Sequence, residues 1–209
     1  LALYRGILVT DPGNAAALGG IDALIASLHA RVEAAIARGD IVDAQRDADR
    51  IALLRSDDSG LPALKKVLDQ AWHVAGLIER GQRLELAGAL IEPRAANAAA
   101  AYRQALALAP TSAAAEAGLE RVEGMFIARA MTEANAARYP QAERLLAQAA
   151  SVRPDSKAWM DARMRVAAIR ERHASLLATQ AIAAAASGDP DRAARLLHEI
   201  ERAAPKSPL

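Results

Sequence analysis

A recurring spacing of small residues constrains the fold of this chain more than any other feature. Each copy has an alanine, a large residue four positions later, a small or aliphatic residue three positions after that, and a proline five positions further on. Positions three, four and seven residues apart share one face of a helix, and small side chains there let another helix approach closely. Proline cannot continue a helix and ends each one. The pattern predicts closely packed helices at three places: Ala98, Tyr102, Ala105 and Pro110; Ala142, Leu146, Ala149 and Pro154; Ala193, Leu197, Ile200 and Pro205.

Two partial copies indicate that the pattern repeats with a long period. One is Ala44–x3–Ala48–x2–Ile51, with Ser56 where the proline is expected, and an earlier one ends at Pro12. Pro110 lies 98 residues after Pro12, since 110 minus 12 is 98. We therefore infer a tandem duplication of a unit of two helix hairpins. The shift of 98 also superposes identical residues elsewhere: Tyr4 on Tyr102, Gly20 on Gly118, Ala44 on Ala142 and Arg55 on Arg153.

The composition agrees with an all-α fold. Hydrophobic residues make up 53% and aromatic residues only 3% of the chain. Alanine, the best helix former, is abundant, and the β-branched residues typical of strands are sparse. A net charge of +1, with acidic and basic residues interspersed, argues against nucleic acid as the partner. The absence of cysteine excludes disulfides, thiolate zinc sites and cysteine nucleophiles. No run reaches the roughly 18 apolar residues of a membrane span, so we expect no membrane insertion within this segment.

Several helices are predicted to be long. Asn14, Ser112 and Ser156 are good N-cap residues for helices that run to about Arg38, residue 137 and residue 187. At ~1.5 Å per residue the last of these would be ~45 Å long. Its apolar residues indicate one continuous face, close to a coiled-coil seam. We expect the segment 61–91, with three glycines, either to continue as a helix or to bend or break. The seam residues are Trp159, Val166, Ile169, Leu176 and Ala183.

The spacing of these copies resembles the second helix of the tetratricopeptide repeat (TPR) family, over nearly the whole chain. The period departs from that family's ~34 residues, because the first helices are lengthened. The resemblance implies an alpha-alpha solenoid of stacked antiparallel helix hairpins, a TPR-like superhelix. It implies one repeat domain over residues 1–209, with two-hairpin units at 1–96 and 97–209, as part of a larger bacterial protein. The setting would be cytoplasmic or periplasmic, with any inner-membrane tether outside this chain.

The resemblance also implies where a partner would bind. In the TPR family the first helices line a concave groove that takes a peptide. Counted from the preceding proline, the inward positions on helices 113–137 and 157–187 include Arg121 and Met125, and Arg165 and Ile169. The arginines would hold a carboxylate, with Met125 as an adaptable apolar floor. Intramolecular salt bridges of these arginines with a neighbouring hairpin are the alternative.

Other polar residues predict no chemistry. The four histidines, at 29, 73, 173 and 198, are spaced too far apart for a shared site, and we interpret them as buried or half-buried packing residues. Asp40, Asp43, Asp47 and Asp49 alternate with arginines, which is typical of a solvated, salt-bridged helix surface. The sequence predicts no catalytic residue, no metal site and no cofactor.

The sequence thus predicts a non-enzymatic protein–protein interaction module, a scaffold that binds a protein or peptide segment in a groove lined by its long first helices. The alternative is a structural spacer or self-association segment of a multidomain bacterial signalling or envelope protein, with a homo-oligomer as its consequence. An enzyme or small-molecule binder would need a deep pocket with converging polar groups, which no motif here predicts.

Overall fold

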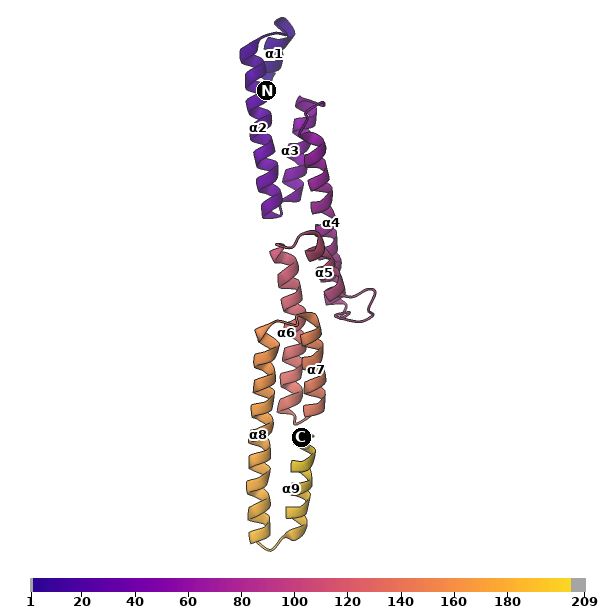
Figure 1. The fold of residues 1–209 in the computed structure, drawn as a ribbon, viewed down its shortest axis with the longest axis vertical. Helices are drawn as coiled ribbons and strands as arrows, with labels where there is room; N and C mark the ends of the chain where they lie inside the picture. The colour runs from indigo at the N-terminus through magenta and orange to yellow at the C-terminus, as the bar shows by residue number, and fades with distance from the viewer. Residues whose placement is uncertain (1, 204–209) are drawn as a thin grey trace. The chain divides into compact units, whose positions relative to one another are not determined.

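The computed structural model of the chain describes residues 2–203, and the side chains of all of these except residues 2 and 5. All the regular structure in this range is α-helical (Figure 1), so the predicted all-α class is confirmed. Pro205, the predicted end of the last copy, lies outside the described residues. The nine helices of residues 2–203 are α1 (Ala2–Thr10), α2 (Ala15–Arg38), α3 (Ile41–Leu54), α4 (Leu61–Leu86), α5 (Ala98–Leu108), α6 (Ala113–Asn135), α7 (Tyr139–Val152), α8 (Lys157–Ala186) and α9 (Pro190–Ala203).

The chain divides into two compact units. The first unit comprises residues 1–77 and 107–110, and the second comprises residues 78–106 and 111–209. Helix α4 passes through the boundary after residue 77. The expectation of a single repeat domain, with its halves meeting at residue 96, stays a prediction.

In the first unit, α2 and α3 pack on each other as a helix hairpin, and α1 packs on α2. The partial copy on α3 faces inward, since Ala44, Ala48 and Ile51 are almost completely buried. Side chains of α4 (Leu61–Leu86) complete this core. The buried cluster consists of Ile21, Ile25, Leu28, Val32, Ala35, Ala44, Ala48, Ile51, Leu61, Leu64 and Leu68.

In the second unit, α6 and α7 form one hairpin and α8 and α9 another, and α8 also packs on α6 and α7. The copy on α5 is wholly inside, because Ala98, Tyr102 and Ala105 have no exposed surface. The copy on α7 is buried in the same way. In α9 the alanine is buried, but Leu197 is 55% exposed. Two of the three complete copies therefore have the predicted burial throughout.

The predicted helix starts are confirmed. Asn14, Ser112 and Ser156 each accept a hydrogen bond from a backbone N–H of the following helix, which satisfies one of its unpaired donors. The predicted ends agree to within two residues. Helix α4 continues through Gly76 and Gly81 to Leu86, so the segment that was left open between a helix and a break is one helix to that point.

The structure repeats its local contacts at positions 98 residues apart. Helices α3 and α7 begin and end 98 residues apart, from residues 41 and 139 to residues 54 and 152. Arg55 pairs with Asp22, and the equivalent Arg153 pairs with Glu120. A Cβ at Gly20 would come within 2.5 Å of the Tyr4 ring, and one at the equivalent Gly118 would come within 2.5 Å of the Tyr102 ring. The internal repeat thus extends from sequence to contacts.

The predicted seam of α8 is wrong in its second half. Leu176 is 55% exposed, and Ala183 is also exposed. The buried stripe follows Val166 and Leu177, which are 11 residues apart. Eleven residues make three turns at ~3.67 residues per turn, whereas a straight helix drifts ~20° from a seven-residue repeat with every heptad. The buried stripe continues one position later than the predicted seam, at Leu177, Ala181 and Ala184.

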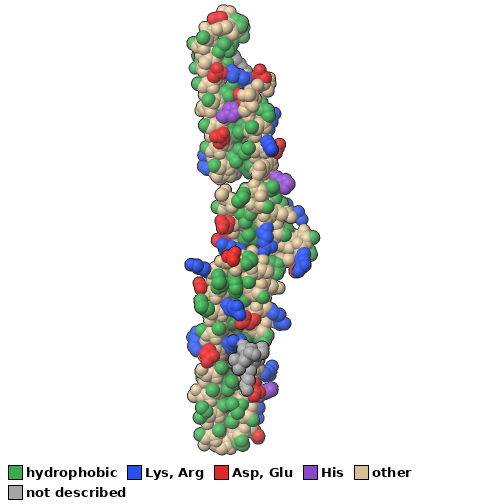
Figure 2. Space-filling view, in the orientation of Figure 1, with side chains coloured by type: hydrophobic (Ala, Val, Ile, Leu, Met, Phe, Trp, Pro, Cys, Tyr) green, Lys and Arg blue, Asp and Glu red, His purple; other side chains and the backbone are tan. Residues whose placement is uncertain are grey.

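Helix α2 is long and apolar enough, by length and composition, to cross a membrane. The same composition is found in core helices of globular domains, and α2 supplies six buried residues to the first unit. Acidic and basic side chains are interspersed over the face of the molecule in Figure 2. The absence of membrane insertion stays a prediction.

Candidate functional site

Arg121, a predicted partner-binding residue, is exposed but paired with residues of its own unit. Its Nε donates to Glu85 Oε1 at 3.0 Å, and its Nη2 donates to Glu85 Oε2 at 3.1 Å. Its Nη2 also lies 3.2 Å from the Tyr102 hydroxyl, and its guanidinium lies 5.9 Å from the centre of the Tyr102 ring. We call Glu85, Tyr102 and Arg121 the Glu85 clasp. It joins α4, α5 and α6, and it is the intramolecular alternative weighed for this arginine.

Burial and hydrogen bonds shift the pKa values of the Glu85 clasp. Burial, reinforced by donation to Glu85 Oε2 at 2.7 Å, raises the pKa of Tyr102 to about 12. Burial alone would raise the pKa of Glu85, but hydrogen bonds from Arg121 and Tyr102 outweigh it and lower that pKa from its ordinary value. The carboxylate is thus charged and fully paired, which suits a structural role.

The other predicted residues are dispersed. Met125 lies one turn after Arg121 on α6 and is 37% exposed. Arg165 is exposed, and its Nε contacts only the Asp161 carbonyl oxygen of its own helix, at 3.4 Å, among the described hydrogen bonds. Ile169 is half-buried against the apolar cluster of α6, α7 and α8. Met125 and Arg165 are therefore the exposed, unpaired members of the predicted set, and partner binding by all four stays a prediction.

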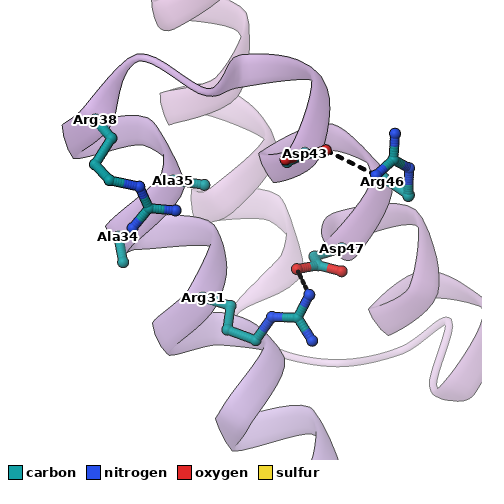
Figure 3. A pocket seen from close by; sticks show the side chains of 7 residues that line it. All are labelled: Arg31, Ala34, Ala35, Arg38, Asp43, Arg46 and Asp47. Carbon is teal, nitrogen blue, oxygen red and sulfur yellow. Dashed lines mark hydrogen bonds and ion pairs between the residues drawn. The ribbon is translucent and has the colours of Figure 1, made fainter.

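A polar pocket of about 180 Å³ lies between α2 and α3 in the first unit (Figure 3). Arg31 on α2 contacts Asp47 on α3 at 2.8 Å, and Arg46 contacts Asp43 at 2.7 Å. Arg38, also in the lining, pairs with Asp40 outside it. Carboxylates and guanidiniums therefore face the same hollow and largely neutralise each other. We interpret this pocket as a salt-bridge network that fastens α2 to α3.

Two acidic side chains are buried against expectation. Asp47 is 4% exposed and pairs with Arg31 and Arg50, so the predicted solvated surface is wrong at this position. Its position three residues after Ala44 was the available signal, since it borders the buried face. Glu123 is 1% exposed; its Oε2 lies 3.3 Å from Arg153, and its Oε1 has no hydrogen-bond partner. Only the structure identifies Glu123 as buried.

The first unit also has an apolar groove of about 440 Å³ between α2 and α4, which we call the α2–α4 groove. Ile36 and Leu64 form its floor, and Val67, 48% exposed, forms one rim. Glu33 is exposed on the other rim, and none of the described ion pairs involves it. The lining residues are His29, Glu33, Ile36, Ala37, Gly60, Ala63, Leu64 and Val67.

A hydrogen-bonded cluster closes one end of the α2–α4 groove. His29 Nε2 lies 2.9 Å from Asp58 Oδ1, and the same oxygen accepts from the Gly60 backbone N–H at 3.1 Å. Gly60 allows this approach, because a Cβ there would come within 2.8 Å of the His29 ring. The cluster fixes the start of α4 against α2.

The equivalent space in the second unit is filled. Shifting the groove by 98 residues places Ile127 and Met131 at the positions of His29 and Glu33, and both pack against the apolar cluster there. Ala162 stands at the position of Leu64 and is fully buried. Helix α6 packs along α8, whereas α2 and α4 make at most marginal backbone contact. One half of the repeat thus has an open groove and the other a closed contact.

The remaining chemistry-bearing residues offer no further site among those described. His29 and His173 are half-buried and hydrogen-bonded, as expected for packing residues, but His73 and His198 are exposed. No group of three metal-ligating side chains occurs among the described residues. A wider hollow of about 570 Å³ near Trp159 is lined by α8 alone. Comparison with protein-family models, curated proteins and solved structures gives no match to this chain.

Proposed function

We propose that the protein is a non-enzymatic helical-repeat module that binds a segment of a partner protein in the α2–α4 groove. Its helices would belong to a TPR-like solenoid in a bacterial protein, with the groove between two of its first helices. The repeated hairpins, the shared N-caps and the contacts 98 residues apart support this proposal. This surface differs from the one expected from the sequence: of the four residues predicted there, only Arg165 has an equivalent in the α2–α4 groove, namely Val67.

The observation that carries the proposal is a difference between equivalent positions of the repeat. The groove is open in the first unit, whereas the equivalent space in the second unit is filled. Ile36 and Val67 leave part of the groove apolar and open above the buried Leu64, whereas Ala134 and Ala162, the equivalents of Ile36 and Leu64, are buried within the second unit. Burying such a strip favours association by about 25 cal/mol per Å² of apolar area. Helical grooves of this kind bind amphipathic segments through aliphatic anchors.

Photo-crosslinking from the groove tests this function. A photoreactive phenylalanine analogue replaces Val67 on the rim, and a matched variant carries it at Val42, which is 61% exposed on α3, outside the groove. We expect a discrete adduct with another protein from position 67 in the native cell, and none from position 42. Equal adducts from both positions, or no adduct from position 67, would contradict groove binding.

Self-association is a second candidate, and the exposure of Leu197 favours it. The equivalent large residues of the other complete copies, Tyr102 and Leu146, are at most 2% exposed because helices cover them on both sides. Leu197 is 55% exposed on α9, which packs on α8. A second copy would cover this face. Sedimentation equilibrium checks it: we expect Leu197→Lys to abolish any concentration-dependent increase in mass, and a wild-type chain that stays monomeric removes the candidate.

A further inference from the structure

The second unit indicates which side chains an occupant of the α2–α4 groove would need, because the equivalent space is filled there. In the second unit the equivalent space is occupied by the side chains of Ile127 and Met131, which lie four positions apart on one helix. In the first unit the same positions are His29 and Glu33, and neither fills the space above Leu64. An occupant that restored the contact would present two aliphatic side chains one helical turn apart.

Charge at the rim adds a second requirement. The Asp58 carboxylate at the closed end is already paired with His29. Glu33 is exposed, lies on the groove, and takes part in none of the described ion pairs. An occupant with a Lys or Arg beside its aliphatic anchors would therefore gain a salt bridge, and an acidic residue there would be repelled.

The dimensions of the groove favour a short helix. The lining on α2 extends from residue 29 to residue 37, and these eight steps at ~1.5 Å per step give a strip about 12 Å long. That length matches about two turns of a helix laid along α2 and α4. Resting on the proposed function, we propose that the occupant is an amphipathic helix of a partner protein, with two aliphatic side chains four positions apart and a flanking basic residue that pairs with Glu33.

Selection from a displayed library of helical peptides tests this partner chemistry. The baits are the wild-type chain, Glu33→Lys, Val67→Arg, and Val42→Arg as a control outside the groove. Val67→Arg installs the residue that the second unit has at the equivalent position, Arg165. We expect wild type and Val42→Arg to enrich aliphatic pairs four positions apart beside Lys or Arg, and Glu33→Lys to enrich Asp or Glu instead. Val67→Arg should enrich neither.

Binding affinities of the selected peptides distinguish the inference from the function beneath it. For peptides that differ only by Lys or Glu at the flanking position, we expect the wild type to favour Lys by about fivefold, as one exposed ion pair provides. Glu33→Lys should reverse the order. Peptides that lose binding to Val67→Arg but show no charge preference would overturn the basic partner and leave groove binding intact. An absence of enrichment, or enrichment equal on Val67→Arg, would overturn both.

Discussion

The two halves of the repeat bury the same pattern at different helix spacings. In the second unit, α6 and α8 meet through Ala130, Ala134 and Ala162, all but completely buried. The equivalent positions in the first unit are Val32, Ile36 and Leu64. Bulky side chains bridge α2 and α4 at a distance, whereas alanines let α6 and α8 approach closely. The comparison teaches that a helix contact made through alanines in one half is replaced by a groove in the half that has larger side chains at the same positions.

The units also differ in the charges that they bury. Ile25 lies in the core of the first unit, and the equivalent Glu123 lies in that of the second. Conversely, the buried Asp47 of the first unit is equivalent to Leu145. A buried carboxylate needs partners, and each unit supplies arginines for its own. Each unit therefore shows which apolar residue the repeat accepts at the position where the other unit buries a carboxylate.

Removing the tyrosine of each half should have the largest effect and should differ between them. Tyr102 is completely buried, whereas Tyr4 is 37% exposed. We expect Tyr102→Ala to lower the free energy of unfolding of the second unit by about 3–5 kcal/mol, and Tyr4→Ala to cost the first unit about 1 kcal/mol. Urea unfolding measures this in single-tryptophan variants, with Trp72 reporting on the first unit and Trp159 on the second. Equal losses would break the comparison.

High pH should destabilise the second unit through the Glu85 clasp. The folded pKa of Tyr102, about 12, lies above its ordinary value of 10.0, so the stabilisation is complete below pH 10 and is lost as the pH rises towards 12. We expect a loss of about 2 kcal/mol by pH 12. The lowered pKa of Glu85 acts at the other end: its contribution is complete above about pH 4.5 and is lost as the pH falls. Unfolding curves of Tyr102→Phe should lack this part of the alkaline loss and keep only the part due to Tyr139, whose pKa burial also raises; an unchanged profile would contradict the assignment.

Giving α8 the large residue of α4 should weaken the closed contact. Ala162→Leu installs the residue found at position 64. A leucine does not fit between α6 and α8, and we expect a loss of about 1–3 kcal/mol in the second unit. Ala167→Leu, on the exposed side of the same helix, is the matched control and should cost little. Urea unfolding followed by Trp159 fluorescence compares the two. If both variants are equally stable, helix spacing does not depend on this alanine.

Replacing the buried Glu123 with isoleucine, the residue at the equivalent position 25, should stabilise the second unit. Glu123→Ile removes a buried carboxylate whose Oε1 has no partner, and Arg153 keeps its ion pair with Glu120 at 3.0 Å. We expect the free energy of unfolding to rise by about 1–2 kcal/mol. Ile25→Glu in the first unit should act in the opposite direction. Thermal unfolding of both variants checks the signs, and destabilisation by Glu123→Ile would show that the carboxylate is required where it lies.

The smallest expected effect concerns the turn after the long helix of each half. Gly39 has φ of 82°, and the equivalent Ala137 has φ of 59°. Both residues sit in the same hydrogen-bonded turn, but the left-handed conformation costs alanine about 1–2 kcal/mol. Allowing for the extra chain entropy of glycine, Ala137→Gly should stabilise by about 0.5–1 kcal/mol and Gly39→Ala should destabilise by a similar amount. Thermal melts of the two variants measure this, and shifts of the same sign would break the equivalence.

The sequence by itself determined the helices, the N-caps at Asn14, Ser112 and Ser156, and the buried faces of α5 and α7. Asn14, Ser112 and Ser156 were identified as caps because capping depends on a side chain and backbone groups within three residues. The copies at Ala98 and Ala142 were placed on buried faces because helical periodicity fixes which positions share a side. The 98-residue repeat was likewise visible in the spacing of Pro12 and Pro110.

The tertiary structure decided which helices meet and what lies between them. For Arg121 the sequence left open a partner or an intramolecular salt bridge, and only the structure shows its pairing with Glu85, 36 residues earlier in the chain. The α2–α4 groove is formed by residues of two helices that are distant in the sequence, such as Ile36 and Leu64. The buried stripe on α8 runs through Leu177 because α8 packs on other helices along its length. These outcomes depend on the combined volumes and charges of side chains from separate helices, whereas caps and periodicity act within one.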